Sequence, residues 1–405
     1  MQILLLNQCF YPDHVATAQH LTELAQGLRS CGHEVTVVAS SRGYENPQTC
    51  YPSKEVWNEI TIHRIWTPGL GKGAKWRRFI NFAGFWISAT LILLKLPRFD
   101  VTVCLTSPPL ISTLGTLMTI LKGGSVVPWV MDLNPDEAVA AGWLKAGGAF
   151  ERTLSLFQNL GLRRASRIVA LDRFMAARLA AKGIPEKAIH VDPPWSHDKA
   201  VRFDLIGRDT FRQEHGLENK FVIMYSGNHS PCHPLDTLLQ ATLSVRDQTR
   251  FHFLFVGGGS EFEKVKAFQK MHKSGNITTL PYQPIELLSA SLSSADLHVV
   301  VLGEAFVGIV HPCKIYNILT LGIPFLTIGP EESHLSDLAS RLPKLDLCYH
   351  VNHGDILGVK KTLIHAVTKG VQRPSVELQS LGREFGVDIL CPRLIRVIED
   401  AAVRT

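Results

Sequence analysis

The sequence predicts an α/β protein made of two doubly wound domains, each with a parallel sheet covered by helices on both faces. Short apolar runs alternate with amphipathic helical patterns along most of the chain, as they do in βαβ units. The pattern starts again near the middle of the chain, and each half opens with a buried strand, a small polar loop and a helix (ILLLNQCFYPDH and FVIMYSGNHSPCH). Because 405 residues exceed one ordinary core, two domains are expected.

Each expected strand is a short apolar run. In the first half these runs are residues 3–6, 34–39, 61–65, 101–105, 126–131 and 167–171, and in the second half 221–225, 251–256, 277–280, 297–302 and 324–328. Helical periodicity lies between them, for example at 17–30, 172–181, 235–243 and 314–321.

The domain junction is expected within residues 192–219, which are polar, contain Pro193 and Pro194, and show no continuous apolar period. The first domain is therefore expected at 1–195 and the second at 196–385. A last helix within 386–405 has no strand partner, and we expect it to return to the first domain.

Composition and charge exclude several classes. With 45% hydrophobic and 19% charged residues, the chain is neither disordered nor fibrous. Residues 61–99 contain seven Lys and Arg and no Asp or Glu, so the net charge of +6 is concentrated there and indicates a local anionic partner rather than a nucleic acid. The eight cysteines form no CxxC pair, which indicates a reducing cytoplasm, and the N-terminus lacks the features of a secretory signal.

Two loops of the second half have the chemistry of an anion site. Residues 225–229 (YSGNH) end a strand and precede a helix, where bare backbone N–H groups and a positive helix end attract a diphosphate. An ordinary turn between strand and helix is the alternative. The glycine-rich loop VGGGS, residues 256–260, lacks the GxGxxG spacing and is expected to be a tight turn that approaches the site closely.

Lys314 lies in the first turn of a helix that Pro312 opens, after a loop containing Gly308. A cation opposes the helix dipole at that end, so its position is understandable if a bound phosphate offsets it. The alternative is a solvated lysine.

The order of YSGN, LDTLL, VGGG, LPYQP and the pattern GxxxPxKxYxxLxxGxP at 308–324 resembles the C-terminal domain of family 4 retaining glycosyltransferases. The segment YPDHVATAQHLTELAQGLRSCGHEVTVV is similar to that family's first strand, loop, helix and strand. TSPPL followed by VVPWVMDLNPDEAVAAGWL resembles a subgroup that builds bacterial surface polysaccharides. The resemblance covers nearly the whole chain and implies the GT-B fold, with two facing Rossmann-like domains.

The resemblance implies a nucleoside diphosphate sugar bound by the second domain. Gly227 and Asn228 would contact the diphosphate, Lys314 would neutralise it, and Pro281 with Tyr282 would flank the base. The departures are specific. Asn317 stands where many members have a ribose-binding Glu, and Asn228 and His233 stand where many have an Arg and a Lys.

Histidines and cysteines gather in the same loops. We expect His229, His233 or His311 to donate hydrogen bonds to the diphosphate or the sugar in place of the missing basic residues. Histidines without a role, and a zinc site that would also use Cys232 and Cys313, are the alternatives. The spacing matches no familiar zinc module, and no metal is expected.

Asp132, at the end of a first-domain strand, is the expected proton acceptor for the acceptor hydroxyl. Asp136 and Glu137 follow, and both can instead be acids of a helix start, the favoured interpretation for Glu137. His14 is a second residue of the acceptor side, and Glu304 is expected to approach the donor sugar. The family resemblance implies retention of the anomeric configuration.

Lys75, Trp76, Arg77, Arg78 and Phe79 are expected to contact a membrane surface. They lead into an apolar stretch, residues 79–94, which as a helix is about 24 Å long, shorter than the roughly 30 Å hydrocarbon core. Aromatic side chains beside a basic cluster are typical of the membrane interface. A spanning helix and a plain core helix are the alternatives.

We therefore expect a retaining, hexosyl-transferring enzyme of polysaccharide biosynthesis. It would move a sugar from a UDP- or GDP-type donor to a lipid-linked or other saccharide acceptor, without cofactor or metal, in the cytoplasm on the inner face of the membrane. A non-catalytic nucleotide-sugar-binding protein on the same fold is the alternative. A phosphorylase or an epimerase would need residues that we do not find.

Overall fold

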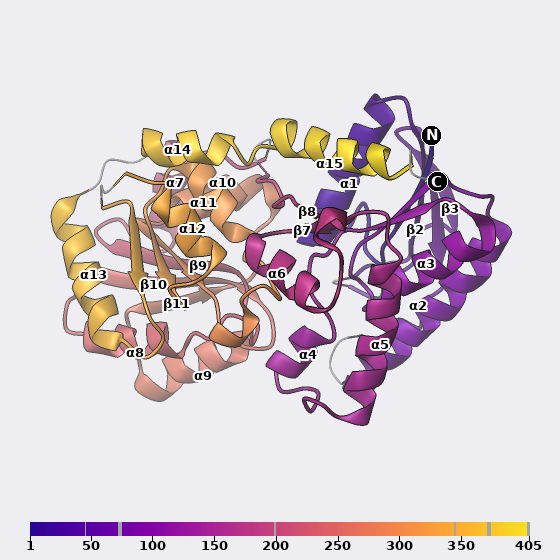
Figure 1. Cartoon of the computed structure of the whole chain (residues 1–405). Coiled ribbons are helices and arrows are strands. Elements are labelled where there is room, and N and C mark those ends of the chain that lie inside the picture. Colours follow the sequence, from indigo (N-terminus) through magenta and orange to yellow (C-terminus); the bar gives the residue numbers. More distant parts are fainter. Residues whose placement is uncertain (45, 72–74, 198–199, 344–345, 371–373, 403–405) are drawn as a thin grey trace. The chain divides into compact units, whose positions relative to one another are not determined.

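The computed structural model describes residues 1–44, 46–71, 75–197, 200–343, 346–370 and 374–402. It divides into two compact units (Figure 1). The first contains Met1–Pro194, Gly308–His311 and Asp388–Thr405, and the second contains Trp195–Val307 and Pro312–Val387. The short segment Gly308–His311 is a part of the first unit that the sequence did not indicate.

The first unit is built on a six-stranded sheet with the order β3-β4-β2-β1-β5-β6. All neighbouring strands are parallel except β3 and β4. The strands are β1 (Gln2–Leu6), β2 (Glu34–Ser40), β3 (Lys54–Trp57), β4 (Ile60–Ile65), β5 (Val101–Cys104) and β6 (Ser125–Pro128). A separate parallel pair is formed by β7 (Ile168–Ala170) and β8 (Ile189–Val191).

Helices cover both faces of this sheet (Figure 1). The helices of the unit are α1 (Ala16–Ser30), α2 (Lys75–Lys95), α3 (Ile111–Lys122), α4 (Asp136–Ala140), α5 (Ala149–Arg163), α6 (Arg173–Ala181) and, from its second residue, α15 (Val387–Ala402). Leu4 and Leu6 of β1 pack with Phe85 of α2 and Leu114 of α3 in one core cluster. Because alternate residues of a strand face opposite sides, the fully buried Ile3 and Leu5 contribute to the other face.

The second unit has an all-parallel sheet with the order β11-β10-β9-β12-β13-β14. The strands are β9 (Phe221–Asn228), β10 (Phe251–Gly258), β11 (Ile277–Leu280), β12 (Leu297–Val301), β13 (Phe325–Ile328) and β14 (Cys348–Val351). The helices are α7 (Leu205–Glu214), α8 (Asp236–Ser244), α9 (Phe262–His272), α10 (Ile285–Ser293), α11 (Lys314–Leu321), α12 (His334–Ser340), α13 (Ile356–Lys369) and α14 (Val376–Arg383).

The run FVIMY of β9 shows why this sheet is buried on both sides. Ile223 and Tyr225 lie in a core cluster with side chains of α8, α9 and α13, whereas Val222 and Met224 lie in a second cluster with side chains of α7 and α10. A continuous apolar run is therefore required, as in other parallel sheets. The expected α/β architecture is confirmed in both units.

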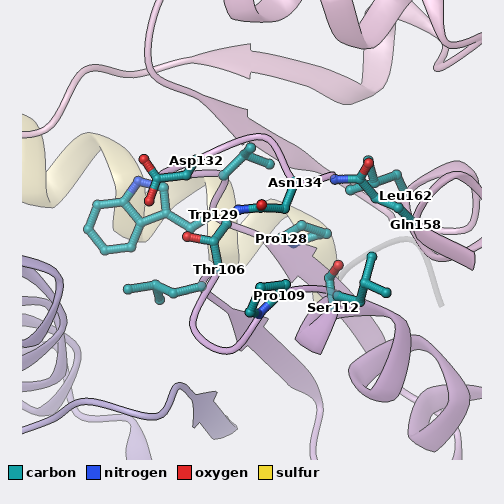
Figure 2. A pocket seen from close by; sticks show the side chains of 12 residues that line it. Thr106, Pro109, Ser112, Pro128, Trp129, Asp132, Asn134, Gln158 and Leu162 are labelled. Carbon is teal, nitrogen blue, oxygen red and sulfur yellow. The ribbon is translucent and has the colours of Figure 1, made fainter. Parts of the chain in front are cut away.

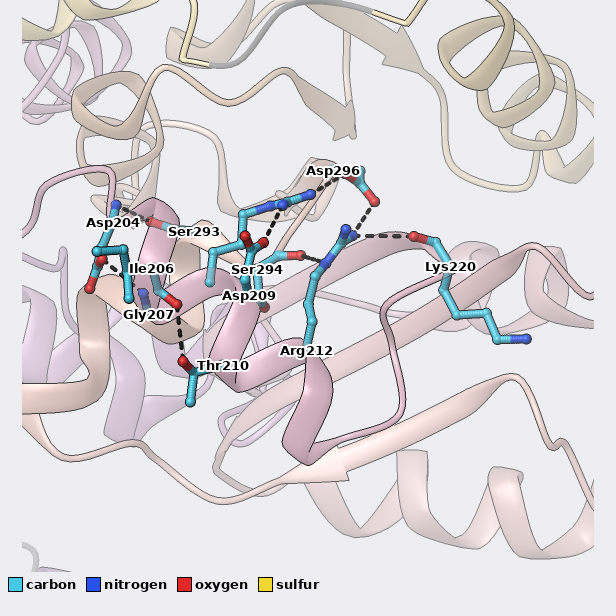
Figure 3. A network of polar contacts seen from close by, with 11 residues as sticks. Asp204, Ile206, Gly207, Asp209, Thr210, Arg212, Lys220, Ser293, Ser294 and Asp296 are labelled. Carbon is cyan, nitrogen blue, oxygen red and sulfur yellow. Dashed lines mark hydrogen bonds and ion pairs between the residues drawn. The ribbon is translucent and has the colours of Figure 1, made fainter.

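Helix α7 lies where the sequence predicts only an irregular junction. Its start is capped by Asp204, whose Oδ1 accepts a hydrogen bond of 2.9 Å from the backbone N–H of Gly207 (Figure 3). Arg212 of α7 pairs with the buried carboxylate of Asp296, which also accepts a 2.7 Å hydrogen bond from the N–H of Val222. Polar contacts therefore hold much of this helix on the sheet, and an apolar pattern alone could not reveal it.

Candidate functional site

The carboxyl ends of β9 and β10 in the second unit are formed by glycines that no other residue could replace. Gly227 and Gly257 are paired across the two strands and have φ angles of 122° and 134°. A Cβ atom on Gly257 would lie 2.1 Å from the carbonyl oxygen of Gly227. Gly259, with φ of 125°, has equally little space, because a Cβ there would lie 2.3 Å from the carbonyl oxygen of His229. Bare backbone is therefore exposed at Gly259 and partly exposed at Gly227, whereas Gly257 is buried against the neighbouring strand.

Lys314 is the first residue of α11, and its ammonium group lies at this glycine edge. Its Nζ is 3.6 Å from the ring centroid of Tyr225 and would lie 3.3 Å from a Cβ on Gly227. The Nζ is buried, and within the described parts of the chain it has no hydrogen-bond partner. Burial lowers the pKa of Lys314 from 10.5 to about 7, since an ammonium group loses its hydration there. A cation–π contact with Tyr225 offsets only a part of that loss.

The two histidines of this loop lie against backbone carbonyls and favour the neutral form. His229 is fully buried, its ring packs against Tyr225 and Phe262, and its Nδ1 lies 2.9 Å from the carbonyl oxygen of Gly227. Burial, with a smaller effect of the Lys314 charge, lowers the pKa of His229 to about 4. His233 has its Nδ1 2.7 Å from the carbonyl oxygen of Val301, and burial lowers its pKa to about 3. Since carbonyls accept, both Nδ1 atoms carry the proton.

One nitrogen of His229 remains available. Its Nε2 is buried and has no hydrogen-bond partner among the residues that the structure describes. With Nδ1 protonated, a neutral Nε2 accepts hydrogen bonds and does not donate them. The expected donation from His229 to a diphosphate would therefore require the other tautomer or protonation of the ring.

The other predicted donor residues of the second unit are spread around this edge. Tyr282 is exposed and lies beside Gly258, where its hydroxyl is 3.4 Å from the carbonyl oxygen. Asn228 and Glu304 are exposed. Asn317 has a different local role, because its Oδ1 accepts a 3.1 Å hydrogen bond from the backbone N–H of His197.

Gly308 and His311 belong to the first unit. A Cβ on Gly308 would lie 2.6 Å from the backbone of Phe174, and φ at Gly308 is 69°. The Nδ1 of His311 is 2.8 Å from Asp172, a residue that also caps α6 through the N–H of Met175. These two residues therefore fasten residues 308–311 to the start of α6.

In the first unit, Asp132 lines a small pocket beyond the carboxyl ends of β5 and β6 (Figure 2). The pocket has a volume of about 20 Å³, which is enough for a water molecule. The labelled lining residues are Thr106, Pro109, Ser112, Pro128, Trp129, Asp132, Asn134, Gln158 and Leu162. Ligands of open α/β sheets bind beyond this end of the strands.

Asp132 is the acid of this region whose pKa is shifted. Burial raises its pKa from 3.8 to about 8, and the charge of Glu137 adds to the rise. Glu137 itself accepts a 3.0 Å hydrogen bond from Nδ2 of Asn134. Tyr44, which sequence reasoning missed, is half-buried within electrostatic range of both acids, and its pKa is raised, chiefly by burial. The backbone of Asp132 is fixed by a bridge to Val310.

The remaining acceptor-side residues differ in their surroundings. Asp136 forms a 2.8 Å ion pair with Lys182, so it joins α4 to α6. Asp136 and Glu137 are both first-turn acids of α4. His14 is exposed.

Trp76, Arg77, Arg78 and Phe79 are exposed at the start of α2, and Arg77 lies over the ring of Trp76 at 5.3 Å. The Lys75 side chain lies outside the part that the structure describes.

The arrangement in the second unit can bind an anion that carries more than one charge. A buried cation, bare strand ends and an exposed aromatic ring lie together at one end of a parallel sheet. Such a set suits a diphosphate attached to a planar base.

Comparison with known proteins agrees with this chemistry. Residues 16–195 match the model of the glycosyl transferase 4-like domain. The WcaI protein of Escherichia coli K12, named as a glycosyl transferase of colanic acid biosynthesis, is 23% identical over 408 residues, which cover 96% of this chain and 100% of WcaI. The chain is a glycosyltransferase whose residues 16–195 match a glycosyl transferase 4-like domain. WbjE of Pseudomonas aeruginosa, also named as a glycosyltransferase, is 25% identical to this enzyme over 59% of the chain and 60% of WbjE.

Solved structures show that this glycosyltransferase has the GT-B fold. Sucrose-phosphate synthase of Thermosynechococcus elongatus superposes with a TM-score of 0.76 at 12% identity, over 100% of both chains. Anabaena HepE in complex with UDP and glucose superposes with a TM-score of 0.73 at 13% identity, over 99% of this chain and 100% of HepE.

Replacing Lys314 with methionine is expected to stabilise the ligand-free enzyme at low pH. The folded protein holds the pKa of Lys314 near 7, whereas the unfolded chain keeps the ordinary value of 10.5, so the unfolded state binds more protons between pH 7 and 10.5. The free energy of unfolding of the wild type therefore rises over this range. Lys314→Met should raise that free energy by about 1–3 kcal/mol at pH 6, and the gain should shrink toward pH 9.

Thermal unfolding at pH 6, 7, 8 and 9 measures this difference. The matched control is Lys361→Met, because Lys361 is an exposed lysine of α13. The control should show no gain that depends on pH. A Lys314→Met variant that is less stable than the wild type at pH 6 would contradict the buried, unpaired state of this ammonium group.

Proposed function

We propose that this glycosyltransferase transfers a hexosyl group from a UDP- or GDP-type sugar to a lipid-linked saccharide, with retention of configuration, in polysaccharide biosynthesis. The observation that carries the proposal is the buried ammonium group of Lys314 beside the glycine edge, with no anionic partner in the described chain. A diphosphate would supply that partner. The name of WcaI and the UDP bound to HepE support the pathway and the type of donor.

Lys314 acts on the leaving group. When the bond between sugar and diphosphate breaks, negative charge develops on the diphosphate oxygens, and a cation placed in advance in a dry site stabilises it strongly. The absence of a side chain on Gly227 allows the diphosphate to approach Lys314. Because the cation of Lys314 neutralises the diphosphate, the reaction needs no metal ion in this proposal.

Asp132 acts on the acceptor. The attacking hydroxyl must lose its proton, and a carboxylate with a raised pKa is a better proton acceptor at neutral pH than an ordinary one. The cytoplasmic face of the membrane is the proposed location, with the start of α2 at the lipid surface. Exposed Trp76, Arg77 and Phe79 support that part.

A screen of nucleoside diphosphates tests the donor site. We expect UDP or GDP to raise the melting temperature more than the other nucleoside diphosphates, since a ligand at 100 times its Kd adds about 2.7 kcal/mol to the free energy of unfolding. Lys314→Met should lower the affinity at least tenfold, and Lys361→Met should not change it. If no nucleoside diphosphate stabilises the wild type, the proposed donor site is wrong.

Substitution of Asp132 tests the acceptor side. Asp132→Asn should lower kcat by about 10²–10⁴ and leave the affinity for the nucleotide unchanged. Wild-type transfer should rise with pH up to about 8, as Asp132 loses its proton, and the variant should lose this rise. Asp136→Asn is the control variant, because Asp136 already pairs with Lys182.

NMR of the product tests the stereochemistry of transfer. The product should have the anomeric configuration of the donor, and an inverted linkage would contradict the retaining mechanism.

A further inference from the structure

Helix α2 is apolar on two opposite sides. Phe85, Ala89 and Leu93 are buried against the sheet. The opposite side carries an exposed stripe made of Trp76, Ile80, Ile87, Leu91 and Leu94, whose spacings of four, seven, four and three keep them on one side of a helix. A helix that is apolar all round is normally buried on all sides, in a core or in lipid. The stripe of α2 lacks such a cover within the first unit, because its side chains are exposed.

The neighbouring helices continue this stripe. Helix α3 exposes Leu117, Ile120 and Leu121 on the side opposite to its buried Ser112 and Gly115. Helix α5 exposes Phe150, Leu156, Phe157 and Leu160. We call these three sets of exposed side chains, together with Phe79, the three-helix face.

Hydrogen bonds hold α2, α3 and α5 next to one another, as Figure 1 also shows. Lys122 at the end of α3 donates 2.8 Å hydrogen bonds to the carbonyls of Leu93 and Leu94 in α2. Thr113 of α3 donates to the carbonyl of Phe157 in α5 at 3.1 Å, and Thr116 donates to that of Gly161 at 3.1 Å. The exposed stripes are therefore parts of one continuous surface.

The charges around this face have one sign. The three helices contain seven Lys and Arg and a single acid, Glu151. Glu151 is engaged locally, since it accepts hydrogen bonds from the N–H of Gly147 and from the hydroxyl of Ser155. Exposed arginines stand at the start of α2 and in α5, and they include Arg77 and Arg152.

We propose that the three-helix face docks this enzyme on an anionic phospholipid surface, so that α3 and α5 insert their side chains beside α2. The proposal rests on the peripheral membrane location proposed above and extends it beyond the start of α2. An exposed apolar surface of this extent marks an interaction site, and basic residues around it match anionic headgroups. A second copy of the chain fits less well, because self-association would bring cations against cations.

Docking by the face also decides how α2 meets the membrane. By length and composition, Trp76–Lys95 is the one helix of the described residues that could cross a bilayer, and 22% of it is buried in the protein. Phe85, Ala89 and Leu93 belong to the core of the sheet, so a crossing would pull them out of it. Helix α2 therefore lies in the plane of the interface, with its exposed stripe in the lipid.

Vesicle binding by the full chain tests the proposal. The wild type should bind vesicles of phosphatidylethanolamine and phosphatidylglycerol, more weakly at 0.5 M NaCl and more weakly to phosphatidylcholine alone. Leu117→Ser with Leu121→Ser in α3, and Phe157→Ser with Leu160→Ser in α5, should each lower the partition coefficient at least tenfold. The matched control is Ile206→Ser with Val376→Ser, which removes apolar side chains of the second unit that are even more exposed and should leave binding within twofold.

The outcomes distinguish docking by the three-helix face from membrane contact by the start of α2 alone. If both serine pairs bind like the wild type while Arg77→Glu with Arg78→Glu does not, the three-helix face is wrong and the contact of α2 remains. If the wild type itself does not bind, the proposed membrane location is wrong as well. The proposed donor site is still tested separately by nucleotide binding. If light scattering shows a dimer that the serine pairs dissociate, the face is an interface between copies and the proposal is overturned. Circular dichroism confirms that each variant is folded.

Discussion

The ammonium group of Lys314 lies inside the second unit with an aromatic ring and glycine backbone around it, and the organisation of the proposed donor site follows from that constraint. A side chain on Gly227 would compete with the ammonium group for space, and a side chain on Gly257 would separate β9 from β10. The strand ends are therefore limited to glycine. The absence of side chains at these glycines also leaves backbone uncovered where a diphosphate would bind. The glycines therefore make room both for the Lys314 side chain and for its ligand.

Burial shifts the pKa values of the reactive groups in both units toward their neutral forms. It lowers the pKa values of Lys314 and His229 and raises that of Asp132, so each group favours its neutral form without a ligand. An anion beside Lys314 would restore its charge, because an opposite charge stabilises the ionised form. In the ligand-free protein, burial thus works against an unpaired charge at each of these groups.

Local sequence patterns were sufficient for most of the fold and for a part of the site. Apolar runs located the central strands of both sheets, and the family resemblance placed Gly227 and Lys314 at one diphosphate, which agrees with their proximity. Strand β3, an edge strand with exposed positions, carried no apolar run. Helix α7 depends on a buried ion pair between residues distant in sequence, which periodicity does not detect.

Long-range pairing accounts for the other omissions. The segment Gly308–His311 belongs to the first unit because the N–H of Leu133 bonds to the carbonyl of Ile309 and because His311 pairs with Asp172. No local feature of the sequence predicts that a short segment from the second half of the chain belongs to the first unit. For the same reason, the ion pair of Asp136 and the hydrogen bond of Asn317 to the chain at His197 appeared only in the structure.

The most direct test is an NMR titration of the Lys314 side chain, labelled at its Cε and assigned through Lys314→Met. The account predicts a pKa near 7 in the free enzyme, which rises by at least two units when the enzyme is saturated with the nucleoside diphosphate that it binds best. A pKa near 10.5 in the free enzyme, or a pKa near 7 that the nucleotide leaves unchanged, would contradict it.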